Sequence, residues 1–545
     1  MNKKILILGI FLSALMVTSC VKDLNVIPKD PNTILAGNLG DNPEYMKQSL
    51  GKIYASFIMA GQGSNGGADI FSDNDGFRIM SRALWNCQEL TTDEAINAWG
   101  DSGVSDINTQ TWSANNLFLT CLYQRLSLSI TYANDFIKLT NGSTDPAIVK
   151  YNAEARFLRA LAYSYSMDLF GNPPFTTDLD GVGKFFPKQL DPDVKIARVK
   201  LFNYIVSELH SIETKLGAPD KVTAQANQAA CWMLLARIYL NAQVYTGTAK
   251  WDSCKIYCDK VTSSGKYSLA TNYRQNFSAD NDGATNPEMI FGWAQDGIKV
   301  QDNGGTTFLI QSCSDGRYIN AATELDLPGN PNWNGNRTKR QFVNVLVDTI
   351  ATYGNVPVPW ATDSLFKQCK DKRVYIRTKK SVDIPSPSSN CDYGIGVFKF
   401  TAKNTDGSRA ANYDRTFAST DWPVFRYADA LLMRAEALHK SGNDAAAITD
   451  VNAVRTRAFG NTTGNITAAQ LTDQFLLNER GREFYYEAHR RTDLVRFGKF
   501  TDGNYNWAWK GGVLAGVNTD KHLNIFPIPG DEVSANPNIK QNPGY

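Results

Sequence analysis

Apolar side chains recur every three to four residues through long parts of this chain. That period is typical of amphipathic helices, which turn one apolar face toward the core. The segments that show it are 44–60, 112–139, 147–170, 196–216, 225–244, 250–263, 425–440, 443–458 and 470–497. The pattern therefore predicts a mainly α fold.

The expected helices are arranged in pairs. Segment 225–244 is followed by the shorter helix 250–263, and within 424–458 one helix leads through a tight turn at Gly442 into a second. Such pairs resemble tetratricopeptide repeats, which stack because one unit cannot bury its apolar face alone. We expect a tetratricopeptide-like helical repeat scaffold.

Turn-forming residues replace this pattern between about 271 and 423. Asn, Asp, Gly, Pro and Thr dominate there, with isolated tryptophans, which predicts loops with short strands at most. A long irregular stretch inside a compact chain usually carries function. The body at 20–545 is therefore expected to have an N-terminal helical part (about 21–270), a loop-rich, ligand-bearing insertion (about 271–423) and C-terminal helices with a tail (about 424–545).

The first twenty residues have the pattern of a lipoprotein signal peptide. A short basic region at 2–4 precedes an apolar run at 5–17, which is too short to span the roughly 30 Å core of a bilayer. The run ends in Val17-Thr18-Ser19-Cys20, small residues followed by a cysteine whose thiol can take a lipid. We expect residues 1–19 to be removed and acyl chains on Cys20 to tether the protein. Ordinary signal cleavage, with Cys20 incidental, is the alternative.

The charge balance and the scarcity of reactive residues argue against several functional classes. The 545 residues include 56 Lys and Arg against 54 Asp and Glu, a net charge of +2, so nothing favours a nucleic-acid partner. The chain has four histidines and lacks the HExxH and GxSxG motifs. We therefore expect no catalytic metal, no activated nucleophile and no cofactor.

Two acidic patterns have alternative interpretations. The Asp-Asn-Asp-Gly loops at 73–76 and 280–283 could each hold a structural calcium ion, but neither has EF-hand spacing, and turn chemistry explains them better. Glu89, Asp93 and Glu94 are close enough in sequence to be considered as the acid and base of a glycosidase. The preferred interpretation is a helix that is capped by a threonine at 91 or 92 and carries Asp93 and Glu94 in its first turn.

Four segments, together with the lipobox, resemble the SusD/RagB family of Bacteroidetes outer-membrane lipoproteins. The segments are AEARFLRALAYSYSMDLFGNPPF (153–175), RYADALLMRAEAL (426–438), NERGREFYYEAHRRTDLVRFGKF (478–500) and NIFPIPGDEVSANPNIKQNPGY (524–545). The resemblance implies four tetratricopeptide-like helix pairs, no catalytic activity and a SusC-type TonB-dependent transporter as partner. It also implies that the lipoprotein captures oligosaccharide at the cell surface and helps to deliver it, in starch or other polysaccharide utilisation.

Two further segments resemble the starch-binding prototype of the family. They are WNCQELTTDEAINAW (85–99) and QDGIKVQDNGGTTFL (295–309). The resemblance implies that Arg82 contacts sugar and that Trp99 and Trp333 are stacking platforms. Asn303 stands where the prototype has an aromatic residue, and a polar contact near Asp101 has changed identity. Starch is therefore one candidate ligand, and the resemblance does not establish it.

The residue types themselves also favour carbohydrate. Sugar recognition uses flat aromatic rings against the CH-rich face of the sugar, with Arg, Asp or Asn bonded to its hydroxyl groups. Trp99 and Trp333 lie beside Gly, Asp and Asn in expected turns, and they can bound one groove only if the insertion folds back over the N-terminal helices. The other candidate tryptophans are Trp85, Trp293 and Trp360.

The leading hypothesis is thus a non-catalytic, surface-exposed glycan-binding lipoprotein. The alternative is a RagB-type lipoprotein that captures peptides, which needs main-chain hydrogen bonding and less aromatic stacking. A surface glycosidase and a purely structural repeat scaffold are the remaining hypotheses.

Overall fold

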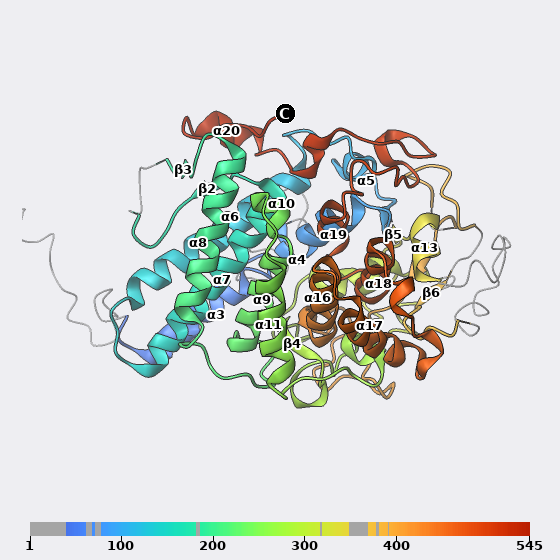
Figure 1. The fold of residues 1–545 in the computed structure, drawn as a ribbon, viewed down its shortest axis with the longest axis horizontal. Coiled ribbons are helices and arrows are strands. Elements are labelled where there is room, and N and C mark those ends of the chain that lie inside the picture. Colours follow the sequence, from blue (N-terminus) through green and yellow to red (C-terminus); the bar gives the residue numbers. More distant parts are fainter. Residues whose placement is uncertain are drawn as a thin grey trace, which may run out of the picture.

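Paired helices occupy both ends of the chain (Figure 1). The computed structural model describes residues 40–61, 68–70, 78–180, 186–316, 319–347, 369–377, 381–390 and 392–545. The N-terminal helices are α3 (Pro43–Ala55), α4 (Met80–Trp85), the π-helix η3 (Asn86–Leu90), α5 (Val104–Thr109), α6 (Leu117–Thr140), α7 (Pro146–Phe170), α8 (Val194–Ile212), α9 (Gln228–Leu240), α10 (Ala242–Thr246) and α11 (Trp251–Ser263). The C-terminal helices are α16 (Tyr427–Lys440), α17 (Asp444–Phe459), α18 (Asp473–Phe484), α19 (Arg490–Arg496) and α20 (Gly530–Ala535).

The long helices begin and end where their local sequence predicts. The Asn42 side chain accepts hydrogen bonds from the amides of Glu44 (3.0 Å) and Tyr45 (3.3 Å) at the start of α3, with a proline at the first helical position. Gly460 ends α17 with a φ of 73°, a left-handed conformation that glycine adopts without strain. The helical periodicity is therefore confirmed for the long segments, within a few residues at their ends, except that 225–244 is divided at Asn241 into α9 and α10.

The expected helix at 470–497 is wrong in one respect, because the structure breaks it into α18 and α19. Tyr486 and Ala488 both have a φ of 64° in the break. The amide of Tyr486 donates to the Glu94 carboxylate, and the amide of His489 donates to Glu89 (2.9 Å). Carboxylates from a distant segment thus accept hydrogen bonds from these amides, and the helix stops.

The expected loop-rich region also contains regular structure, which corrects the prediction of short strands at most. Its described residues include the short helices α12 (Gly305–Cys313) and α13 (Arg340–Leu346). The strands form antiparallel two-stranded pairs: β1 (Ile96–Asn97) with β5 (Asn336–Arg337), β2 (Pro174–Phe175) with β3 (Lys188–Gln189), β4 (Met289–Trp293) with β8 (Trp422–Arg426), and β6 (Ile376–Arg377) with β7 (Gly396–Val397). The 3₁₀ turns are η4 (Tyr273–Phe277), η5 (Gly283–Thr285), η6 (Thr462–Gly464), η7 (Ala468–Gln470), η8 (Lys510–Gly512) and η9 (Lys521–Asn524).

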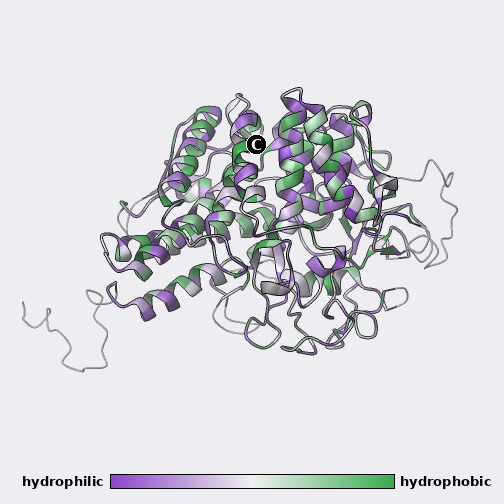
Figure 2. Ribbon diagram, turned by 60° about the horizontal axis from the view of Figure 1, so that its bottom comes forward, coloured by the Kyte–Doolittle hydropathy of each residue, from purple (hydrophilic) through white to green (hydrophobic). Residues whose placement is uncertain are grey.

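The two helical halves meet side by side. The antiparallel pairs α6/α7, α9/α11 and α16/α17 each pack together, and α11 of the N-terminal half also packs on α16 of the C-terminal half. Apolar and polar residues alternate around the helices in Figure 2, as the sequence pattern requires. The strand pair β4/β8 ties the start of the loop-rich region to the strand that leads into α16. Within the described ranges, no helix combines the length and the apolar character needed to cross a bilayer.

Buried ion pairs hold the C-terminal half together. The Arg426 guanidinium is fully enclosed and bonds the carboxylates of Glu288, Glu483 and Glu487. These partners come from the strand segment before β4 and from α18 and the turn after it. A buried charge is tolerated only when it is paired in this way.

The burial of one carboxyl group leads us to expect an unusual pH dependence of the free energy of unfolding. Burial raises the pKa of Asp421 to about 8, whereas an unfolded aspartate titrates near 3.9. Between these values the unfolded chain ionises freely and the folded chain retains its proton, so this group lowers the free energy of unfolding as pH rises from about 4 to 8. Asp421→Asn, which can still accept the hydrogen bond from the Gln295 amide, should flatten that fall. Urea unfolding at pH 4.5, 6 and 8 measures it.

The matched control is Asp531→Asn at an exposed position, which should leave the pH profile of stability unchanged. Parallel profiles for the wild type and Asp421→Asn would contradict the buried-carboxyl explanation.

Candidate functional site

A short strand pair brings two distant loops of the chain together. β1 pairs with β5, with Ile96 opposite Arg337 and Asn97 opposite Asn336. The amide of Ala98 extends the pairing by donating to the carbonyl of residue 335 at 3.0 Å. The turn that carries Trp99 therefore lies beside the turn that carries Trp333.

The indoles of Trp99 and Trp333 are neighbours at the surface. Their ring centroids are 6.5 Å apart with an interplanar angle of 51°, and both side chains are partly exposed. Trp99 Nε1 donates to the Trp333 carbonyl (3.2 Å), and Trp333 Nε1 donates to the carbonyl of Asn330 (2.9 Å). The expectation that the insertion folds back over the N-terminal part and unites these two residues is confirmed.

Three asparagines with a left-handed backbone conformation shape the turn that carries Trp333. Asn330, Asn332 and Asn334 have φ values of 51°, 65° and 59°, a region that asparagine enters more easily than most residues. The amide of Trp333 donates to the carbonyl of Gln311 near the end of α12 (2.9 Å). The Asn-rich sequence thus produces a turn that stands on a helix end and presents its tryptophan.

Arg82 lies beneath this aromatic pair. Its guanidinium carbon is 4.5 Å from the ring centroid of Phe308 and 5.4 Å from that of Trp99, and the residue is only 5% exposed. Burial lowers the pKa of Arg82 to about 10, against the opposing effect of Asp101 and Asp302, so it stays charged near neutral pH. Arg82, which the family resemblance makes a sugar contact, supports the Trp99 ring from the inner side by cation–π attraction.

Two of the expected tryptophans belong to the core, which corrects the prediction that they contact a ligand. Trp85 has no exposed surface and packs edge-on against Tyr486, with centroids 5.2 Å apart. Trp293 is 3% exposed and lies in β4 against Trp422. Each is enclosed by aromatic neighbours, so neither offers a ring face to a ligand. Trp360 lies outside the described residues.

The two polar candidates, Asp101 and Asn303, are partly exposed. Asp101 lies two residues after Trp99, and Asn303 precedes α12. The loop of Asn303 is ordered by its neighbour Asp302, whose carboxylate accepts hydrogen bonds from the amide of Ala60 (2.7 Å) and from those of residues 303 and 304. Burial raises the pKa of Asp302 to about 6.

In the described range 78–180, no helix begins directly after Thr91 or Thr92, which corrects the expected helix cap, and the carboxylates of this segment do not form an open acid and base pair. Residues 91–95 form a turn between η3 and β1. Asp93 makes a two-pronged ion pair with Arg490, with both N···O distances 2.8 Å. Glu89 and Glu94 are buried, which raises the pKa of Glu89 to about 7 and that of Glu94 well above its usual range. These carboxylates bond the segment that leads into β1 and Trp99 to the C-terminal half.

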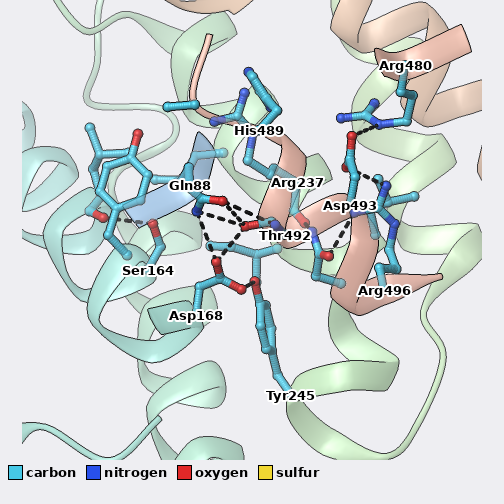
Figure 3. Close-up of a pocket in the computed structure, with 17 residues that line it drawn as sticks. Gln88, Ser164, Asp168, Arg237, Tyr245, Arg480, His489, Thr492, Asp493 and Arg496 are labelled. Carbon is cyan, nitrogen blue, oxygen red and sulfur yellow. Dashed lines mark hydrogen bonds and ion pairs between the residues drawn. The ribbon is translucent and has the colours of Figure 1, made fainter. Parts of the chain in front are cut away.

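A small polar cavity lies behind η3 (Figure 3). Asp168 accepts hydrogen bonds there from Tyr245 (2.9 Å) and Thr492 (2.6 Å), and Gln88 donates to the same threonine (2.9 Å). Burial lowers the pKa of the neighbouring His489 to about 3, so its ring stays neutral. The cavity measures about 40 Å³, room for a few ordered waters only, and we interpret it as a structural junction of α7, η3 and α19.

A larger groove of about 660 Å³ runs along α6, between the segment that follows β2 and helix α20. Ser127 and Asp135 on α6 and Glu532 on α20 line it. None of the expected site residues lies there. Its size is that of a small-molecule pocket, and it is the second place to test for binding.

Of the two loops in the calcium prediction, the structure describes 280–283. Asp280 Oδ1 accepts hydrogen bonds from the amide and hydroxyl of Thr405, both at 2.8 Å. Among the residues that the structure describes, no three His, Cys, Asp or Glu side chains gather in an arrangement that could hold a metal ion. Loop 73–76 and the expected lipidation site Cys20 lie outside the described residues.

Sequence reasoning missed the residues that support the aromatic pair. Phe308, Asn97, Gly335 and Asn336 are buried or tightly packed beneath it. Asn334 and Gly335 directly after Trp333 could have indicated close packing at this turn. Turn chemistry alone, however, accounts for an asparagine and a glycine at these positions.

Comparison with known proteins gives consistent matches. Residues 238–545 match the family described as the SusD family. The chain is 33% identical to the starch-binding protein SusD of Bacteroides thetaiotaomicron, over 97% of this chain and 96% of that protein. It is 24% identical to SusD-like protein P25 of Formosa agariphila, over 97% of both chains.

Solved structures show the same fold. A SusD-like protein of Bacteroides fragilis superposes with a TM-score of 0.68 at 18% identity, covering 95% of this chain and all of that one. A laminarin-binding SusD-like protein gives 0.63 at 21% identity, over 92% of this chain and 99% of that one. The surface glycan-binding protein A of Bacteroides fluxus gives 0.65 at 20% identity, over 92% and 100%.

Proposed function

The chain belongs to the SusD family, and from that premise we propose that it is a non-catalytic protein that binds polysaccharide or oligosaccharide at the cell surface. It captures the glycan and passes it to a SusC-type TonB-dependent transporter. Three of the matched proteins are named for binding: a starch-binding protein, a laminarin-binding protein and a surface glycan-binding protein.

The observation that carries the proposal is the partly exposed pair Trp99 and Trp333. The two ring centroids are 6.5 Å apart and the ring planes meet at 51°, so the indoles offer adjacent apolar faces. The CH-rich faces of consecutive sugars pack on such surfaces. Asp101, whose charge acts on Arg82, and Asn303, which follows Asp302, are partly exposed and are the candidates for hydrogen bonds to sugar hydroxyl groups. Arg82 stacks against the Trp99 ring.

Peptide capture by the same architecture is the alternative. Such binding relies on main-chain hydrogen bonds to an open strand edge or groove. The β1 strand beside Trp99 is two residues long and already pairs with β5. The surface therefore presents aromatic rings and few main-chain groups that could hydrogen-bond a peptide. The observation favours carbohydrate.

The decisive experiment uses the soluble protein that begins after Cys20. Affinity electrophoresis and calorimetry against starch, laminarin, a panel of other polysaccharides and a peptide library should show binding to a glycan. No reducing ends should be released on prolonged incubation. Binding to peptides alone would establish the alternative, and reducing ends that disappear in a Glu89→Gln variant would establish a glycosidase.

We propose that acyl chains on Cys20 tether the protein at the outer membrane. Cys20→Ala should leave a full-length protein that no longer partitions with membranes, because acyl chains are the anchor in this proposal. Fractionation of cells and detergent phase separation measure it. Cys369→Ala, which alters a thiol in the folded body, is the control and should stay with the membrane. Unchanged membrane partition of Cys20→Ala would contradict the proposal.

The transporter partner is testable in the same cells. Affinity purification of the lipidated protein should recover a TonB-dependent transporter in defined stoichiometry. Recovery of the protein alone under mild detergent conditions would argue against such a complex.

A further inference from the structure

We propose that Gly335 and the amide pair Asn97–Asn336 are positioning residues that hold the Trp99 indole in its ligand-binding orientation. The inference rests on the proposed function of the aromatic pair and assigns the residues that set its geometry. None of these three residues need touch the ligand, since each acts through Trp99.

The Trp99 indole lies directly on the backbone of Gly335. A Cβ atom at position 335 would lie 2.5 Å from Trp99 Cε2 and 2.6 Å from Nε1, well inside van der Waals contact. Gly335 is not among the residues with positive φ, so its backbone conformation would accept alanine. The space for the indole is therefore what requires glycine here.

A chain of buried amide hydrogen bonds fixes the backbone on both sides of this contact. Asn97 Nδ2 donates to Asn336 Oδ1 (2.6 Å), and Asn336 Nδ2 donates to the hydroxyl of Ser312 in α12 (2.8 Å). In return, Asn97 Oδ1 accepts a hydrogen bond from the amide of Trp99 (2.8 Å). Asn108 bonds both the amide (3.1 Å) and the carbonyl (2.8 Å) of Asn97.

These contacts leave the indole little freedom before a ligand arrives. Gly335 and Arg82 limit it from the inner side, its Nε1 is bonded to the Trp333 carbonyl, and its own amide is bonded to Asn97. A ligand that stacks on a ring already in place does not have to order it, and affinity rises when that cost is removed. Disturbing the support should therefore weaken binding even though the platform residues remain.

The first test compares two glycine substitutions close to Trp99, one in contact with its indole and one outside the site. Gly335→Ala should push the indole outward and weaken binding of the best glycan from the polysaccharide panel by about tenfold or more. Gly100→Ala is the matched control, because Gly100 follows Trp99, has no positive φ, and a methyl group added there would meet no atom within 4 Å. It should bind as the wild type does.

A double-mutant cycle shows whether the effect passes through Trp99. In a Trp99→Ala background the space under the indole is empty, so adding Gly335→Ala should cause no further loss of affinity. An equal loss in both backgrounds would overturn the inference, as would normal binding by Gly335→Ala alone.

A spectroscopic readout keeps the inference falsifiable without any ligand. In protein labelled with 5-fluorotryptophan, the ¹⁹F resonance of Trp99, assigned with Trp99→Phe, should shift or broaden in Asn97→Ser and in Gly335→Ala. The resonances of core tryptophans should keep their positions, whereas a general loosening of the fold would move them as well. An unmoved Trp99 resonance in both variants overturns the inference. Failure of the wild type to bind any glycan would instead overturn the proposed function, and this readout would still decide the positioning.

Discussion

Trp99→Ala and Trp333→Ala should each weaken glycan binding by about 1–3 kcal/mol, which is roughly 5- to 150-fold in the dissociation constant. Each substitution removes a ring face on which a sugar would pack. Because the two rings are in contact, the loss in the double variant should be smaller than the sum of the single losses. Calorimetry with the preferred oligosaccharide measures all three variants.

The melting temperature separates this role from a role in the core. Both tryptophans are partly exposed, and Trp99 also packs on Arg82 and Gly335, so each single variant should lose clearly less stability than the roughly 3–5 kcal/mol typical for replacing a fully buried tryptophan with alanine. Trp251→Ala, at the partly exposed start of α11, is the control and should bind normally. If the site variants melt several degrees lower and still bind, the two tryptophans are structural. The ligand must then be sought in the groove along α6.

Arg490→Met should lower the free energy of unfolding by about 3–5 kcal/mol, the largest stability loss that we predict. Arg490 and Asp93 are both fully buried, and removing the guanidinium leaves the carboxylate enclosed without its counter-ion. The hydroxyl of Tyr505 still donates to it (2.5 Å), but a neutral donor does not replace the lost charge. Urea unfolding followed by circular dichroism measures the loss.

An exposed ion pair of similar geometry provides the control. Arg340 bonds both carboxylate oxygens of Asp383, but the side chains are 31% and 64% exposed. Arg340→Met should therefore cost no more than about 1 kcal/mol. Adding Asp93→Leu to Arg490→Met removes the uncompensated charge and should recover part of the stability. A cost for Arg490→Met no larger than that for Arg340→Met would show that Asp93 is not enclosed as the structure has it.

The sequence alone determined the parts of this protein that depend on local patterns. Period and capping located the long helices, because an amphipathic helix must place an apolar residue every three to four positions and its first amides need an acceptor such as Asn42. Turn residues around Trp99 and Trp333 predicted that these rings would be accessible. The family resemblance rested on similarly local motifs, and the matched relatives confirmed it.

Only the tertiary structure decided which distant residues meet. Nothing within α18 or α19 predicts the break between them, since carboxylates about 400 positions away, at Glu89 and Glu94, accept the hydrogen bonds of its amides. Trp85 and Trp293 have the same ring as Trp99, and their burial depends on neighbours that come from other parts of the chain. Local periodicity specifies a helix because its hydrogen bonds join residues four apart, whereas a ligand surface depends on long-range packing that no single segment encodes.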